Sequence, residues 1–133
     1  QALRDGWLHT GDVGSVDDDG YLRVLDRRDD LVVTGGENVF PTEVEEILCS
    51  HPQIRDACVV GVPDPEWGQR VVAAVVPEPG SNPSDDVLER HCRDRLAGYK
   101  VPSAFRRVDL IPRTVTGKLR RHEIREAWPK GDA

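Results

Sequence analysis

The residues best placed to do chemistry are Gly117 and Lys118, within the segment Pro112–Arg121 (PRTVTGKLRR). Glycine adopts a positive φ without a Cβ clash, so the chain can turn tightly there and leave the next side chain projecting. A lysine is a compact positive charge on a flexible stem, which suits the oxygens of a phosphate or a carboxylate. A Gly-Lys pair is also compatible with a solvated lysine at a helix start, so the rest of the sequence must decide between the two interpretations.

Turn residues and apolar spacing predict the elements that would hold this turn. We expect strands at residues 6–16, 21–25, 31–34, 54–62, 71–76 and 105–110, and helices at 41–50, 85–97 and 119–127. Pro41 suits the first turn of its helix, and Ser84 suits the N-cap of the next one. The order predicts an α+β fold with a small mixed β-sheet flanked by helices and preceded by a β-hairpin, whose turn is Asp17–Gly20.

The 133 residues, 38% of them hydrophobic, are enough for one domain with a modest core. The net charge of −6 is unevenly distributed: residues 1–90 carry 7 Lys and Arg against 19 Asp and Glu, whereas residues 91–133 carry 11 against 5. A basic end on an acidic body favours a local anionic partner over general nucleic-acid binding. Cys49, Cys58 and Cys92 lack metal-ligand spacing and predict free thiols in a cytoplasmic protein. No apolar run approaches the ~18 residues that a membrane span needs.

Three further motifs accompany the Gly-Lys segment. They are GWLHTGD (Gly6–Asp12), DRRDDLVVTGGENVFPTEVE (Asp26–Glu45) and PEWGQ (Pro65–Gln69). In this order, the four motifs closely resemble the C-terminal region of the adenylate-forming enzymes, a superfamily of acyl- and aryl-CoA synthetases, adenylation domains of nonribosomal peptide synthetases and beetle luciferase. The resemblance extends over nearly the whole chain, from about Gly6 to Glu126.

This resemblance implies a two-step ligase. A carboxylic acid attacks the α-phosphate of ATP, and the thiol of coenzyme A then displaces AMP from the acyl-adenylate, while a small C-terminal domain rotates between the two steps. Residues 1–26 would be the end of a large N-terminal adenylation domain, residues 27–128 the mobile C-terminal domain, and residues 129–133 a tail. The missing N-terminal domain would bind Mg²⁺ and most of the ATP, so we expect this chain alone to be inactive.

The resemblance also assigns roles to single residues. Lys118 matches the family's adenylation lysine, which bridges the carboxylate of the acid and the α-phosphate, where negative charge accumulates. Asp12 matches the carboxylate that accepts hydrogen bonds from both ribose hydroxyls, and Arg27 matches an arginine that contacts the ribose or the phosphate. Asp29 lies at the hinge position.

The same resemblance implies a second face, which would serve thioester formation. Gly35, Gly36 and Glu37 match the loop that swings toward the active site for the second step, where small residues let the backbone approach the pantetheine chain of coenzyme A. Trp67 matches a tryptophan that some CoA ligases place against the nucleotide of coenzyme A. A tryptophan that packs on the sheet is the alternative at this position.

The residues that would contact the phosphates of coenzyme A are less clear from the motifs. Some aryl-CoA ligases carry basic residues where this chain has Val101 and Ser103. Lys100, Arg106 and Arg107 lie nearby in the sequence and are the candidates to replace them.

The motifs look most like those of o-succinylbenzoate-CoA ligases and bacterial fatty-acyl-CoA ligases, and the acid would be selected by the missing domain. One alternative is the adenylation domain of a nonribosomal peptide synthetase. Another is a recognition module that presents Lys118 to a protein lysine acyltransferase, because acylation would remove the charge that the mechanism needs. A nucleic-acid-binding domain would explain the charge asymmetry but none of the motifs.

Overall fold

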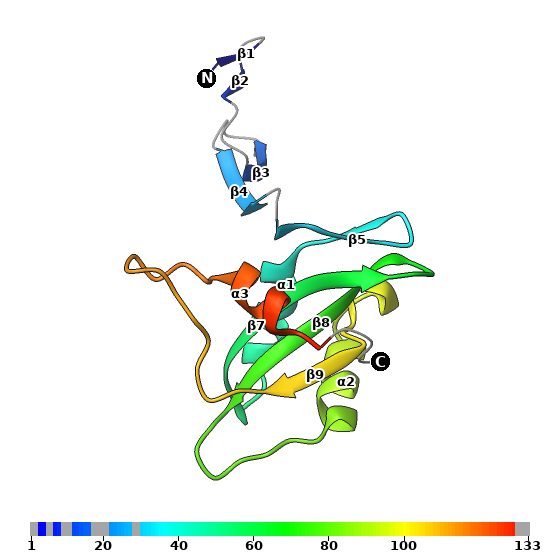
Figure 1. The fold of residues 1–133 in the computed structure, drawn as a ribbon, viewed down its shortest axis with the longest axis vertical. Helices are drawn as coiled ribbons and strands as arrows, with labels where there is room; N and C mark the ends of the chain where they lie inside the picture. The colour runs from blue at the N-terminus through cyan, green and yellow to red at the C-terminus, as the bar shows by residue number, and fades with distance from the viewer. Residues whose placement is uncertain (1–2, 5–6, 9–11, 17–21, 28–29, 130–133) are drawn as a thin grey trace.

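A three-stranded mixed sheet forms the centre of the computed structural model, which describes residues 3–4, 7–8, 12–16, 22–27 and 30–129 (Figure 1). Strands β7 (Ile54–Asp64) and β8 (Gly68–Pro77) pair in antiparallel fashion, and β9 (Ala104–Arg107) pairs parallel to β8. Parallel strands need a crossover connection, and α2 (Asp85–Arg93) lies in the one between β8 and β9. The predicted α+β fold is therefore confirmed.

The sheet is buried on both faces, which explains the nearly continuous apolar runs of β7 and β8. Alternate side chains enter two different clusters, because successive residues of a strand point to opposite faces. Val59 and Ala73 pack with α1 (Pro41–Cys49) and α2, whereas Val60 and Val72 pack against the side of α3 (Arg121–Ala127). Helices thus cover both faces of the sheet, and among the described elements α3 is the only helix on its side (Figure 1).

The turn between β7 and β8 is shorter than the predicted loop at residues 63–69. The ladder continues beyond Val62 to the pair Asp64 and Gly68. One carboxylate oxygen of Asp64 accepts hydrogen bonds from the backbone N–H groups of Glu66 (2.8 Å) and Trp67 (2.9 Å). An Asp side chain that bonds to the backbone in this way closes a tight turn, so only residues 65–67 remain outside the strands.

A second hairpin corrects the expectation for the Gly35-Gly36 segment. The predicted strand is present as β5 (Val32–Thr34), but it is followed by an unpredicted strand, β6 (Glu37–Val39), with which it pairs in antiparallel fashion. Gly35 (φ +57°) and Gly36 (φ +81°) occupy the turn. Two consecutive positive φ values are typical of a two-residue type I′ hairpin turn.

The other helices and strands follow the sequence closely, with shifted ends. The Ser84 hydroxyl accepts a hydrogen bond from the Val87 N–H and caps α2, as predicted, but α2 ends at Arg93 and the chain continues into a 3₁₀ turn, η2 (Gly98–Lys100). Helix α3 begins at Arg121, two residues later than expected, and β9 is shorter than its prediction.

Near the N-terminus, β3 (Asp12–Val16) and β4 (Leu22–Arg27) form the expected hairpin, whose turn lies outside the described residues. The single strand expected at residues 6–16 is divided: β2 (Trp7–Leu8) pairs with β1 (Leu3–Arg4). Figure 1 places these two strand pairs at one end of the molecule, away from the three-stranded sheet.

The three cysteines are free thiols, as predicted. Cys58 and Cys92 are buried in the two core clusters, and burial raises the pKa of the Cys58 thiol to about 12. Cys58 and Cys92 are therefore core residues, whereas Cys49 is exposed.

Candidate functional sites

Lys118 lies on a tight hairpin-like turn that begins at Thr114. The Thr114 N–H donates to the Lys118 carbonyl oxygen (2.8 Å), and the Lys118 N–H donates to the Thr114 hydroxyl (3.1 Å). Gly117 takes φ +92°, a conformation that favours glycine, and its N–H donates to the Thr114 carbonyl (2.9 Å). These contacts fix the backbone of Lys118, as the Gly-Lys motif predicted.

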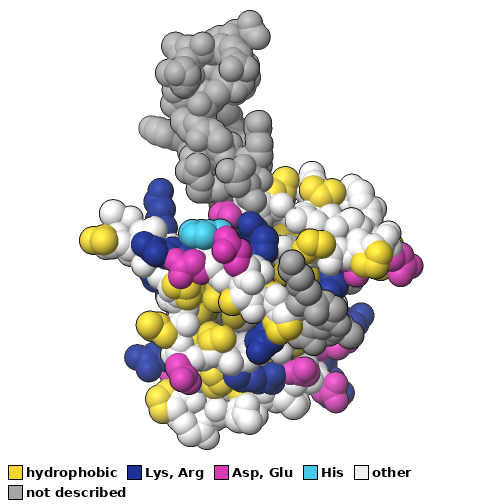
Figure 2. Space-filling model, in the orientation of Figure 1, with side chains coloured by type: hydrophobic (Ala, Val, Ile, Leu, Met, Phe, Trp, Pro, Cys, Tyr) yellow, Lys and Arg dark blue, Asp and Glu magenta, His cyan; other side chains and the backbone are white. Residues whose placement is uncertain are grey.

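The Lys118 side chain is exposed to solvent, and within the described part of the chain its ammonium group has no hydrogen-bond or ion-pair partner. Val115, on the same turn, is fully exposed, with a relative accessibility of 105%. In Figure 2 the projection at the left edge carries hydrophobic atoms at its tip and Lys or Arg atoms beside it. The turn therefore presents a cation and an apolar tip to solvent.

A second candidate site is formed where the tips of two hairpins meet. The Gly35 N–H donates to the Trp67 carbonyl oxygen (2.9 Å), which ties the β5–β6 turn to the β7–β8 turn. A Cβ atom at Gly35 would lie 2.8 Å from Cε3 of the Trp67 ring, so only glycine allows this close approach. The structure thus brings together two residues that the motifs had assigned to one face.

These tips border a groove of about 260 Å³, which we call the Trp67 groove. It is lined by Thr34, Gly35, Glu37, Trp67, Arg70, Val71, Tyr99, Val101 and Ser103. Trp67 and Tyr99 are 54% and 42% exposed, so two aromatic rings are accessible there. Aromatic faces beside a guanidinium group suit a nucleotide, because the rings can stack on a base and the cation can bind a phosphate.

The three basic residues proposed to replace the missing phosphate contacts do not line this groove. The ammonium group of Lys100 lies 2.9 Å from a Glu43 carboxylate oxygen, and this hydrogen bond raises the pKa of Lys100. Arg107 binds Asp85 and the Pro83 carbonyl oxygen. Arg106 is placed over the Trp128 ring, 5.8 Å from its centroid.

Arg70 is the groove residue that the sequence did not identify. It lies on β8 and donates a hydrogen bond to the Ser103 hydroxyl (3.2 Å) across the β8–β9 edge. The only available signal was its position three residues after Trp67, and that spacing indicates proximity only once β8 is known to begin at Gly68.

The two sites lie at opposite ends of the domain. In Figure 1 the orange segment between β9 and α3, which carries the Lys118 turn, projects to the left, whereas the β5–β6 and β7–β8 turns lie to the right. One ligand position therefore cannot use both sites while the domain keeps a single orientation.

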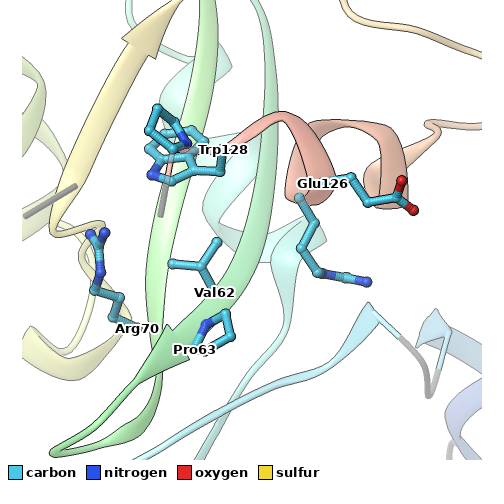
Figure 3. A pocket seen from close by; sticks show the side chains of 7 residues that line it. Val62, Pro63, Arg70, Glu126 and Trp128 are labelled. Atoms are coloured by element: carbon cyan, nitrogen blue, oxygen red, sulfur yellow. The ribbon is translucent and has the colours of Figure 1, made fainter. Parts of the chain in front are cut away.

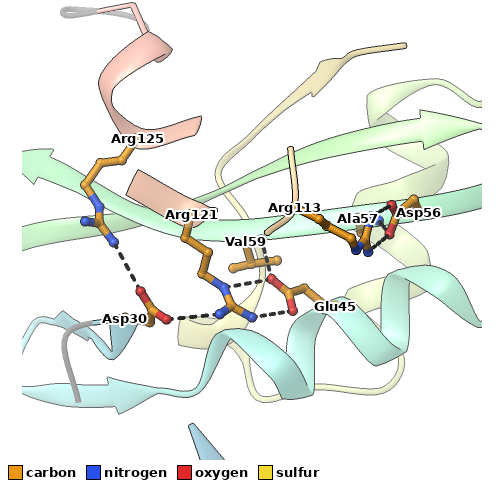
Figure 4. Close-up of polar contacts among 8 residues, drawn as sticks. All are labelled: Asp30, Glu45, Asp56, Ala57, Val59, Arg113, Arg121 and Arg125. Atoms are coloured by element: carbon orange, nitrogen blue, oxygen red, sulfur yellow. Dashed lines mark hydrogen bonds and ion pairs between the residues drawn. The ribbon is translucent and has the colours of Figure 1, made fainter. Parts of the chain in front are cut away.

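A polar network with little exposure to solvent connects Asp30, α1 and α3 (Figure 4). Arg121 binds Glu45 through two hydrogen bonds, at 2.7 and 3.1 Å, and binds Asp30 at 3.1 Å. Glu45 also accepts a hydrogen bond from the Val59 N–H at 2.8 Å.

A separate ion pair joins Arg113 to Asp56 through two hydrogen bonds. The guanidinium group of Arg113 holds the pKa of the Asp56 carboxyl below its usual value.

The predicted nucleotide contacts lie on the β3–β4 hairpin, where the structure describes the strand pairing. Asp12 and Arg27 are direct partners across this ladder, so the backbone places them opposite one another. The predicted hinge residue, Asp29, lies outside the described residues. Among the described residues, no group of three or more potential metal-binding side chains gathers, and no helix is long and apolar enough to cross a membrane.

Comparison with known proteins agrees with the motifs. Residues 43–118 match the family model described as the AMP-binding enzyme C-terminal domain. The 2-succinylbenzoate–CoA ligase of Geobacillus kaustophilus is 49% identical over 130 residues, covering 98% of this chain and 26% of that protein. The feruloyl-CoA synthase of an Amycolatopsis species is 48% identical over 128 residues, covering 96% of this chain and 26% of that protein.

Solved structures give the same answer. The o-succinylbenzoate CoA synthetase of Bacillus subtilis, determined in complex with its acyl-adenylate intermediate, superposes with a TM-score of 0.86 at 42% identity, over 99% of this chain and 27% of the other. The chain thus spans about a quarter of the length of the relatives it matches. It belongs to the AMP-binding enzyme C-terminal domain family.

Proposed function

We propose that this chain is the mobile C-terminal domain of an ATP-dependent acyl- or aryl-CoA ligase, in which Lys118 serves adenylation and the Trp67 groove serves thioester formation. The observation that carries this proposal is the separation of the exposed Lys118 turn from the Trp67 groove, at opposite ends of one domain. A rotation about a hinge at Asp29 would present each end in turn to one active site on the preceding domain.

In the first step, the Lys118 ammonium group would lie between the carboxylate of the acid and the α-phosphate of ATP. Negative charge accumulates there as the acyl-adenylate forms, and a positioned cation lowers the energy of that state. The turn suits this role because its backbone is fixed by Thr114 while the side chain extends into solvent. Asp12 and Arg27 would hold the ribose or phosphate from the preceding hairpin, and Mg²⁺ would accompany ATP on the preceding domain.

In the second step, coenzyme A would enter along the Trp67 groove. Trp67 and Tyr99 offer accessible rings to its base, and the glycine turn at Gly35 and Gly36, with Glu37 beside it, lets the backbone approach the pantetheine chain. Lys100, which follows Tyr99 of the groove in the chain, forms an ion pair with Glu43. The preceding domain would select the acid. The enzyme would act in the cytoplasm.

The proposal is tested in the full-length enzyme with Lys118→Ala. We expect loss of ATP–pyrophosphate exchange and retention of thioester formation from supplied acyl-adenylate, because only the first step needs this cation. Arg120→Ala is the matched control: Arg120 is a neighbouring cation whose guanidinium pairs with Glu123 at 2.8 Å, and its loss should leave exchange near the wild-type rate. Exchange that persists in Lys118→Ala would overturn the assignment.

The two alternatives have less support. The relatives described above are CoA ligases, which disfavours the adenylation domain of a nonribosomal peptide synthetase. The exposure of Lys118 is compatible with modification by a lysine acyltransferase, but the ligase mechanism requires the same exposure, so this observation does not favour the recognition module.

A further inference from the structure

We propose that Leu110 and Val115 form an apolar contact with the preceding domain of the enzyme during adenylation, and that this contact positions the Lys118 turn. This inference rests on the function proposed above and concerns the first half-reaction only.

The distribution of exposed hydrophobic side chains is the first argument. Among the described residues, the large ones are Val33, Trp67, Val87, Tyr99, Leu110 and Val115. The two most exposed, Leu110 at 79% and Val115 at 105%, both lie on the segment that carries Lys118. Three of the others lie in the Trp67 groove or next to it in the chain. A single exposed hydrophobic residue is common on a protein surface, but several at one place indicate a contact site.

A cavity of about 490 Å³ near the end of α3 does not account for this exposure (Figure 3). Its apolar walls include Val62, Pro63 and Trp128, and none of the six exposed side chains lines it. The accessible apolar surface of Leu110 and Val115 therefore lies outside this cavity.

The second argument is that the exposed segment is firmly held by the rest of the domain. Ile111 is buried, and Leu119 packs against the same core cluster from the other end of the turn. Between them, Arg113 forms its ion pair with Asp56 of β7. A surface that is already ordered loses little conformational freedom when a partner binds it. The tip of the Lys118 turn is therefore suited to docking as a preformed element.

The third argument identifies the preceding domain as the partner. This chain spans about a quarter of the length of its relatives, so most of each relative lies outside the matched region. In the proposed first step, Lys118 enters an active site on that part of the enzyme, and Val115, three positions earlier on the same turn, would be carried there with it. A lysine on its flexible stem orients poorly by itself, whereas burial of two aliphatic side chains would hold the turn in one position.

The test measures both half-reactions in the full-length enzyme after Val115→Ser and Leu110→Ser. Each change removes apolar surface and leaves Lys118 in place. We expect each to slow ATP–pyrophosphate exchange about tenfold or more, the effect of losing one buried aliphatic side chain. Thioester formation from supplied acyl-adenylate should stay at the wild-type rate, because the Trp67 groove serves that step. Val115→Ile keeps the apolar surface and should keep exchange near the wild-type rate.

Val87→Ser is the matched control, because Val87 is an exposed apolar residue on α2, which carries neither site, and both half-reactions should be unchanged. The urea midpoints of Val115→Ser and Leu110→Ser should equal that of the wild type, since both side chains are exposed in this domain. Wild-type exchange in the double variant, or an equal loss in both half-reactions, would overturn the inference. Exchange that persists in Lys118→Ala would instead overturn the proposed first step, so the two failures are distinguishable.

Discussion

Arg121 and Glu45, 76 positions apart in the sequence, form a bidentate ion pair between α3 and α1. The side chains of Arg121 and Glu45 are only 11% and 10% exposed. The Glu45 carboxylate also accepts a hydrogen bond from the Val59 N–H of β7. One carboxylate thus joins a strand and two helices that cover opposite faces of the sheet.

Replacing Glu45 should therefore be costly. We expect Glu45→Ala to lower the free energy of unfolding by about 3 kcal/mol, because a buried guanidinium group loses its main counter-charge. The exposed neighbour Glu46 is the control, and Glu46→Ala should change stability by less than about 0.5 kcal/mol. Urea unfolding of both variants measures the difference, and equal losses would show that the pair has no special role.

The Arg113–Asp56 pair predicts a pH dependence. Arg113 holds the pKa of Asp56 below its usual value in the folded state, so the unfolded chain takes up the proton first as the pH falls. The stabilisation is complete above about pH 4, the ordinary range for aspartate, and it is lost as the pH falls through the lowered folded pKa. Asp56→Asn should therefore reduce stability at neutral pH and make little difference in strong acid.

Unfolding free energies of the wild type and Asp56→Asn, measured between acid and neutral pH, check this expectation. Asp109→Asn, at an exposed carboxylate outside the ion pair, controls for the change in net charge. A gap between wild type and Asp56→Asn that is independent of pH would contradict the coupling.

The contact of Gly35 with Trp67 can be separated from the backbone strain at the same turn. Gly35→Ala and Gly36→Ala each place a side chain at positive φ, which costs about 1–2 kcal/mol. Only at Gly35 does the new Cβ meet the Trp67 ring, whereas nothing lies within 4 Å at Gly36. We expect Gly35→Ala to be the more destabilising of the two, and the gap to close in a Trp67→Ala background. Thermal unfolding of the four variants gives the answer, and a gap that survives removal of the ring would locate its cause in the backbone.

Much of the fold could be predicted because its signals are local. The valine-rich runs of β7 and β8 predict buried strands, and Ser84 marks the start of α2. Strand β6 was missed because only Val39 of its three residues is buried, which is too short an alternation to recognise. Helix α2 was extended too far because Leu96 continues the spacing of Leu88 and Cys92, although it packs on the core after the helix has ended.

The candidate-site residues also differ in whether a local sequence pattern could identify them. Lys118, Gly35 and Trp67 lie within recognisable motifs, so their proximity to turns could be expected. Arg70 acquires its surroundings from β9, whose pairing with β8 brings Ser103 beside it from 33 positions away. No local pattern contains that information, because it depends on the crossover between two parallel strands.

The ion pair of Arg121 with Asp30 has one further consequence. It clamps the first residue of the globular part to α3, at 3.1 Å, and the Arg125 guanidinium group lies 4.0 Å from the same carboxylate. The proposed rotation of this domain against the preceding sequence would therefore take place before position 30. In the rotation proposed above, the residues beyond this ion pair would move together, so a small change of angle before position 30 would produce a large displacement at the Lys118 turn and at the Trp67 groove.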